Sequence, residues 1–165
     1  MRFVVFVFLL FTVVIVIDSC TKDKAPISAP FEFSDKQLFV IVSDTTNRKF
    51  YKNNPNLLPP ASSSPHGSFR LWFNPKAQTV LDASGKLPVN GIFPDSSLLV
   101  KEVLIPLFDS IPVLAVMYKL QGSWKWAEYE FDGDVVYSIK KDPSACVSCH
   151  SLSPNRDLVR TFDLH

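Results

Sequence analysis

The residues with the clearest chemical meaning in this chain form the run Cys146-Val147-Ser148-Cys149-His150. In a C-x-x-C-H run, the two cysteine sulfurs add to the two vinyl groups of a haem, and the histidine supplies an axial imidazole to the iron. The run therefore predicts one covalent haem c, attached through Cys146 and Cys149, with His150 as the metal ligand.

Two other uses of a C-x-x-C pair stay open at this stage. A redox-active or structural pair is typical of a strand–loop–helix context, and a zinc site needs a second pair of ligands. The sequence offers little for either use, because the only other cysteine is Cys20 and the only other histidines are His66 and His165.

The N-terminal segment predicts export. Met1-Arg2 is a short positive start, and in the fifteen-residue run 3–17 that follows, every residue but Thr12 is apolar. The run is shorter than the roughly 20 residues of a spanning helix, and it has the length of the apolar region of a signal peptide. Residues 1–19 are therefore predicted to be a signal peptide, and the protein is expected outside the cytoplasm, where haem c is attached.

The end of this segment, Ile17-Asp18-Ser19-Cys20, resembles the lipobox of bacterial lipoproteins, although Asp18 is unusual there. We expect lipidation at Cys20, which would leave a membrane-anchored lipoprotein facing the periplasm or the cell surface. The alternatives are an ordinary cleaved secretory signal and an uncleaved anchor.

The rest of the chain has the composition of one ordinary domain. The whole sequence has a net charge of +1, and no basic stretch interleaves with aromatic residues, so we expect no nucleic-acid partner. Residues 20–33 are polar and contain proline, which predicts a tether. Residues 34–165 are predicted to be the haem domain.

The residue pattern of this domain predicts an α+β fold. Strands are expected over 69–73, 98–105, 113–120 and 124–131, and the third should be central because it is apolar on both faces. Asn74 as N-cap and Pro75 as first helical residue predict a helix of two or three turns that ends near Gly85. We therefore expect an antiparallel sheet with one or two short helices and a C-terminal haem-binding segment.

The sequence also supports expectations for the segments between these elements and for the aromatic residues. Residues 37–43 can be a strand or a helical turn, and the proline-rich segment 53–67 is expected to be a loop. Four aromatic residues of the fourth strand are expected to pack in the core and against the haem. They are Trp124, Trp126, Tyr129 and Phe131.

This order of parts resembles the cytochrome P-460 family, which includes the related β-sheet cytochromes c′. The resemblance runs from about Ser68 to Phe162. The segments that carry it are Phe69-Arg70 with Asn74-Pro75-Lys76-Ala77, Gly91-Ile92-Phe93-Pro94-Asp95, Val100-Lys101-Glu102, Trp126-Ala127-Glu128-Tyr129, the haem run and Asp157-Leu158-Val159.

The resemblance gives two residues, Lys101 and Arg70, candidate catalytic roles. In the enzymes of this family, a lysine at the place of Lys101 is bonded through its amine to a meso carbon of the porphyrin, and hydroxylamine oxidation accompanies that bond. Lys101 shares a strand face with Leu99 and Val103; the alternative is a lysine whose stem carries its amine to water. Arg70 can pair with a haem propionate or donate to an iron-bound ligand; the alternative is a surface arginine stacked on Trp72.

The sequence contains no obvious sixth ligand, so we expect a five-coordinate iron. Met117, His66 and His165 are the residues that could reach the iron through folding. Asp157, which follows the haem run, is expected to cap a helix or to bond to the backbone near His150.

Three functions remain open on these grounds. The first is a haem enzyme that acts on hydroxylamine or nitric oxide, the second is a gas-binding module without turnover, and the third is an electron carrier, which normally needs a six-coordinate iron. Expected partners are a small nitrogenous or diatomic ligand, a redox partner protein and the membrane through the lipid anchor. A homodimer also stays open.

Overall fold

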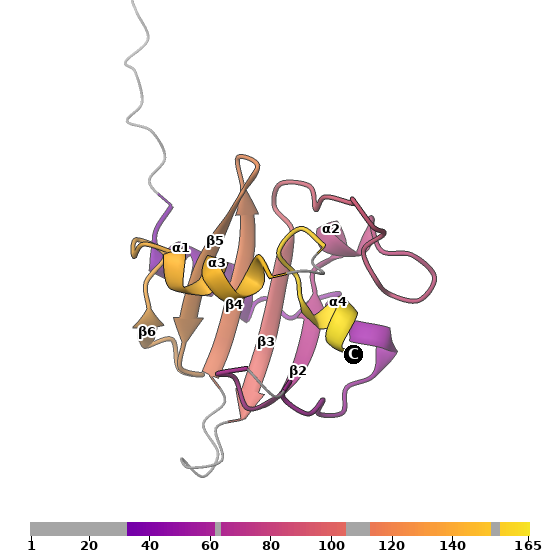
Figure 1. Ribbon diagram of the computed structural model, residues 1–165. Helices are drawn as coiled ribbons and strands as arrows, with labels where there is room; N and C mark the ends of the chain where they lie inside the picture. The colour runs from indigo at the N-terminus through magenta and orange to yellow at the C-terminus, as the bar shows by residue number, and fades with distance from the viewer. Residues whose placement is uncertain (1–32, 62–63, 105–112, 153–155) are drawn as a thin grey trace, which may run out of the picture. The chain divides into compact units, whose positions relative to one another are not determined.

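The structure, a computed structural model, describes residues 33–61, 64–104, 113–152 and 156–165. Within them, six strands form one antiparallel sheet in sequence order (Figure 1). They are β1 (Lys49–Phe50), β2 (Ser68–Phe73), β3 (Leu98–Leu104), β4 (Val113–Leu120), β5 (Ser123–Tyr129) and β6 (Val135–Tyr137). The helices are α1 (Asp35–Ser43), α2 (Pro75–Gln78), α3 (Ser144–His150) and α4 (Thr161–Leu164), with a 3-10 turn η1 at Tyr51–Asn53.

These elements confirm the predicted α+β class. The four expected strands correspond to β2, β3, β4 and β5, and β4 is paired on both sides, as its apolar faces predicted. The edge strands β1 and β6 were not predicted. They contain two and three residues, too few for a period-two pattern to be recognised.

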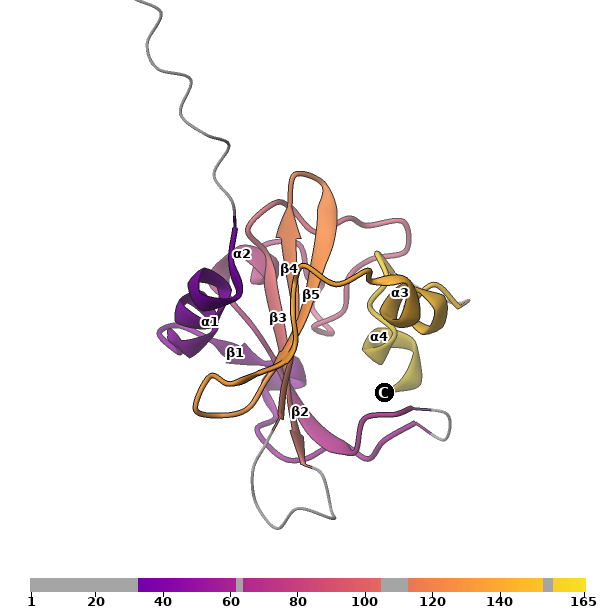
Figure 2. The same cartoon turned by 90° about the vertical axis from the view of Figure 1, so that its left-hand side faces the viewer.

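The sheet separates two apolar cores, because alternate side chains of each strand point to opposite faces. On one face, α1 packs through Leu38 and Val42 against Trp72 and its neighbours. On the other face, the segment that contains α3 and α4 packs against a core that includes Phe69 and Leu71. Figure 2 shows α1 on one side of the sheet and α3 with α4 on the other.

Two helices show how local sequence determines their ends. The undecided segment 37–43 is part of α1, whose N-terminus is closed by a capping box between Ser34 and Gln37. In α2, Asn74 is the N-cap and Pro75 the first residue, as predicted. Its predicted length is wrong, because Asp82 accepts hydrogen bonds from the backbone N–H groups of two following residues and directs the chain into a turn.

The aromatic residues of the fourth predicted strand are buried with one exception. Trp124, Trp126 and Tyr129 lie in the cores, whereas Phe131 is 68% exposed. The expectation for Phe131 is wrong because β5 ends at Tyr129, so that Phe131 lies in the turn to β6.

Several predictions fall on residues that lie outside the described ones, namely the signal peptide 1–19, the lipidation site Cys20 and nearly all of the tether 20–33. Among the described residues, no helix combines the length and the apolar character needed to span a bilayer.

Candidate haem site

The C-x-x-C-H run forms α3, and this helix borders a cavity of about 290 Å³ on the α3–α4 side of the sheet. Cys146, Cys149 and His150 all line this cavity, and both thiols are free. Its opposite wall comes from β2, β3, β4 and β5 and is mostly apolar, with Leu71 and Leu99 among its residues. The three residues of the motif therefore line one cavity.

The imidazole of His150 is held in one orientation by two contacts. Its Nδ1 lies 2.8 Å from the backbone carbonyl oxygen of Leu158. A carbonyl only accepts, so Nδ1 carries the proton and Nε2 keeps its lone pair. The indole of Trp126 packs edge-on against the ring, at 4.7 Å between centroids. Burial lowers the pKa of His150 to about 4, although the bond to Leu158 opposes this shift, so the ring is neutral at pH 7.

Lys101 lies in the middle of β3, paired with Leu71 of β2 and Ala115 of β4. Its side chain lines the cavity, and its amine lies 4.4 Å from the centroid of the Phe69 ring. Burial lowers the pKa of Lys101 to about 8. A fraction of this amine is therefore unprotonated near neutral pH, which an ordinary lysine is not.

Two further protonatable groups border the same cavity. Nδ1 of His66 lies 4.0 Å from Oε1 of Glu128. Burial, followed by the charges of Lys101 and His150, lowers the pKa of His66 to about 4, and burial raises the pKa of Glu128. Groups with perturbed pKa values gather at functional sites more often than elsewhere. In the sequence, Glu128 was noted only as part of a segment that carries the family resemblance. The sequence did not predict that it lies beside His66.

Arg70 does not line this cavity. It lies on the α1 side of the sheet, where its Nη2 is 2.6 Å from Oε2 of Glu102, and Arg48 contacts the other carboxylate oxygen at 3.0 Å. The arginine that stacks on Trp72 is Arg48, at 5.7 Å from the ring centroid. The structure therefore gives Arg70 an ion-pair partner in place of a position beside the predicted haem.

Arg160 is the cavity arginine that sequence reasoning missed. Its Nη1 lies 3.3 Å from the backbone oxygen of Cys149 and 3.8 Å from that residue's Sγ. Its Nε and the Thr161 hydroxyl are buried without a hydrogen-bond partner among the described residues, and both residues line the cavity. These polar atoms are available to a polar group bound there. A lone arginine near the C-terminus carries no sequence signal for this role.

The three candidate sixth ligands are not equally placed. Met117 and His66 both line the cavity. His165 packs edge-on against Phe69, at 5.5 Å between ring centroids, and is not among the described residues that line it.

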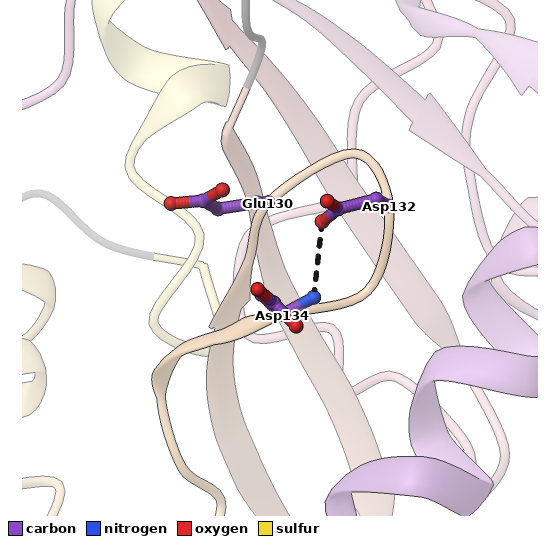
Figure 3. Close-up of side chains that lie close together, drawn as sticks. All are labelled: Glu130, Asp132 and Asp134. Atoms are coloured by element: carbon purple, nitrogen blue, oxygen red, sulfur yellow. Dashed lines mark hydrogen bonds between the residues drawn. The ribbon is translucent and has the colours of Figure 1, made fainter.

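A second cluster of polar groups lies in the turn between β5 and β6 (Figure 3). The carboxylates of Glu130, Asp132 and Asp134 lie within 4.8 Å of one another, and the Asp134 N–H donates to Asp132 Oδ1 at 3.2 Å. Calcium prefers six to eight oxygen ligands, and exposed acidic turns are common without an ion. We assign no function to this cluster.

Comparison of the chain with protein-family models, with curated proteins and with solved structures found no match. The cytochrome P-460 resemblance therefore stays a prediction that rests on the sequence motifs.

Proposed function

We propose that this protein is an exported mono-haem c-type cytochrome of the P-460 type, which binds or acts on small nitrogen species such as hydroxylamine or nitric oxide. One observation carries the proposal above all others. Cys146, Cys149 and His150 line one cavity, and the hydrogen bond from Nδ1 of His150 leaves its Nε2 free to ligate a metal.

The residues of the cavity fit a covalent haem. Two free thiols on one short helix match the attachment chemistry, and the unpartnered Arg160 Nε and Thr161 hydroxyl offer donors to polar substituents. The cavity volume lies close to the lower end of the roughly 300–1,000 Å³ typical of small-molecule sites. When bound, the haem iron would supply redox chemistry or reversible binding of a small ligand.

The chain's own residues would then have separate tasks. The Leu158 carbonyl orients His150, and the apolar walls of the cavity exclude water from the bound group. The amine of Lys101 is partly unprotonated near neutral pH, so it has the lone pair that a bond to a porphyrin carbon would need. Such a bond would replace a C–H bond of the porphyrin with loss of two electrons and two protons, and a peroxide would have to be the oxidant. Lys101 remains our candidate for the catalytic cross-link. Arg70 is paired with Glu102 and does not line the cavity, so we give it no part in the proposed chemistry.

A gas-binding protein without turnover is the second candidate function. The observation that favours it is the apolar part of the sheet wall, which includes Leu71, Leu99 and Met117, because apolar surroundings favour binding of a diatomic ligand over its activation. An electron carrier would need a sixth ligand, for which Met117 and His66 are the candidates beside the cavity.

The test of the haem assignment is the purified protein from a host that attaches haem c. We expect an intact mass increased by one haem and a haem-stained band on a denaturing gel that survives extraction with acidified organic solvent. Cys149→Ser should leave at most one thioether, and His150→Ala should remove the imidazole ligation. Ser148→Ala, between the two cysteines, is the matched control and should keep both. Loss of colour on extraction would overturn the proposal.

A further inference from the structure

The segment that follows the haem run contains two residues in the same disfavoured backbone conformation. Asp157 and Leu158 have φ angles of 49° and 65°. This left-handed region is uncommon for residues with a side chain, and two in succession persist only where surrounding contacts hold them. The turn therefore needs an anchor.

The anchor is a buried ion pair with Lys119, at the end of β4. The Lys119 ammonium lies 2.8 and 3.0 Å from the two carboxylate oxygens of Asp157, and only 4% and 11% of the two side chains are exposed. The backbone N–H of Phe93 donates to the same carboxylate at 2.9 Å, and the Trp124 indole N–H donates to the Asp157 carbonyl at 2.9 Å. Three separate segments thus hold one residue.

Stability alone does not explain this arrangement. A buried ion pair is often no more stabilising than apolar residues of the same size, because both charges lose their hydration, and one use of such a pair is to specify a conformation. Here the conformation has a clear consequence. The residue after Asp157 is Leu158, whose carbonyl accepts the hydrogen bond from His150 at 2.8 Å.

We propose that Lys119 and Asp157 are positioning residues that set the orientation and tautomer of the predicted axial ligand by holding the Leu158 carbonyl against His150. This inference rests on the proposed function, since it treats His150 as the ligand. Asp157 is not among the described residues that line the haem cavity, so it acts through Leu158 and does not touch a group bound in the cavity. A hydrogen bond donated by the nitrogen that does not bind the metal makes a ligating histidine more basic. The pair would therefore influence the reduction potential of the iron.

The test compares variants of the pair in the haem-loaded protein. Asp157→Ala and Lys119→Met should each lower the iron–histidine stretching frequency of the ferrous protein and raise its reduction potential, because the imidazole loses its fixed acceptor. The double variant should shift both quantities no further than either single variant, since the two residues act as one unit. Lys119→Arg should restore most of the wild-type values.

Asp163→Asn is the matched control. Asp163 also forms an ion pair in the C-terminal segment, with Arg156 at 3.2 Å. Asp163→Asn should leave the iron–histidine stretching frequency and the reduction potential unchanged. Equal shifts in this control, or unshifted values in Asp157→Ala and Lys119→Met, would overturn the inference while the haem assignment stands. Should Asp157→Ala not fold, Asp157→Asn removes the charge while it keeps an acceptor for Phe93.

A measurement without haem separates this inference from the proposed function. If the protein carries no haem, the proposed function fails, and nitrogen NMR of the imidazole still reports the tautomer of His150 in the folded chain. We expect the Nδ1–H tautomer in the wild type and a mixture of tautomers in Asp157→Asn. A mixture in the wild type would overturn the inference.

Discussion

At the scale of single residues, the cavity next to α3 gathers side chains whose protonation differs from that in water. Lys101 and His150 are both shifted toward their neutral forms, and the main cause is burial. Neutral imidazole is the form that ligates a metal, and neutral amine is the form that attacks carbon. Burial in this cavity therefore prepares both residues for the roles that we propose.

The first prediction concerns Lys101. If its amine is bonded to the porphyrin, the conjugated system is altered, and the absorption of the wild type should lie to the red of an ordinary c-type haem. Lys101→Met keeps an apolar stem on the cavity wall but has no amine. It should restore the ordinary spectrum and abolish hydroxylamine oxidation, measured with an artificial electron acceptor, while haem attachment stays intact.

Arg70→Gln is the control for this experiment, because Arg70 lies on the other face of the sheet and is paired with Glu102. It should leave the spectrum unchanged. An ordinary wild-type spectrum together with a free Lys101 in a peptide map would reject the cross-link and favour the gas-binding function.

At the scale of elements, the turns that join β4, β5 and β6 depend on glycine. Gly122 has a φ of 74° in the hairpin between β4 and β5, and Gly133 has a φ of 103° between β5 and β6. A Cβ on Gly122 would meet nothing within 4 Å, whereas one on Gly133 would lie 2.6 Å from the Phe39 ring of α1. The second turn is therefore also a packing contact between the sheet and α1.

The second prediction follows from this difference. Gly122→Ala should lower the free energy of unfolding by about 1 kcal/mol, the cost of positive φ for alanine. Gly133→Ala should lower the free energy of unfolding by about 1–3 kcal/mol more than Gly122→Ala does, since Phe39 must move. Urea denaturation measures both. Because α1 covers the face away from the cavity, neither substitution should change the haem spectrum, and equal losses of stability would contradict the role of Phe39.

At the scale of the whole molecule, the described domain has three layers, with α1 on one face of the sheet and α3 with α4 on the other. The predicted haem site lies in the second of the two cores. Its walls come from segments that are far apart in the chain, from His66 before β2 to Thr161 in α4. Loss of global folding should therefore remove the site as a unit.

The third prediction concerns stability at acid pH. The pKa of His66 is about 4 in the folded chain, below its ordinary value of 6.5, so between these values the unfolded chain binds more protons. Stability should fall as the pH drops through this window, and His66→Gln should reduce that fall. Urea unfolding at pH 6.5 and near pH 4 measures it. An unchanged pH dependence in the variant would show that His66 is not buried in its neutral form.

The fourth prediction concerns the membrane. We propose that lipid at Cys20 holds the exported protein on a membrane, because the apolar run 3–17 is too short to span comfortably and a polar segment follows it. Cys20→Ala should prevent lipid-dependent processing, so the variant should lack the mass of the lipid and should keep residues 1–19. The same mass in the variant, apart from the substitution itself, would show that the lipobox interpretation is wrong.

The sequence by itself determined the features that depend on neighbours along the chain. Alternating side chains predicted β2, short apolar runs next to turn residues predicted β3 through β5, and Asn74-Pro75 predicted the start of α2. The spacing of the two cysteines is that of a haem-attachment run, and the haem itself stays a prediction. Each of these patterns is local, since the pleat of a strand, a helix cap and the separation of two vinyl groups extend over only a few residues.

The tertiary structure decided which distant side chains meet. It paired Arg70 with Glu102, brought Arg160 and His66 to the cavity, and joined Lys119 to Asp157 across 38 positions of sequence. Contacts of this kind follow from strand register and from the packing of α3 and α4 on the sheet. A shift of register by one residue would turn Lys101 to the other face, so no local pattern contains this information.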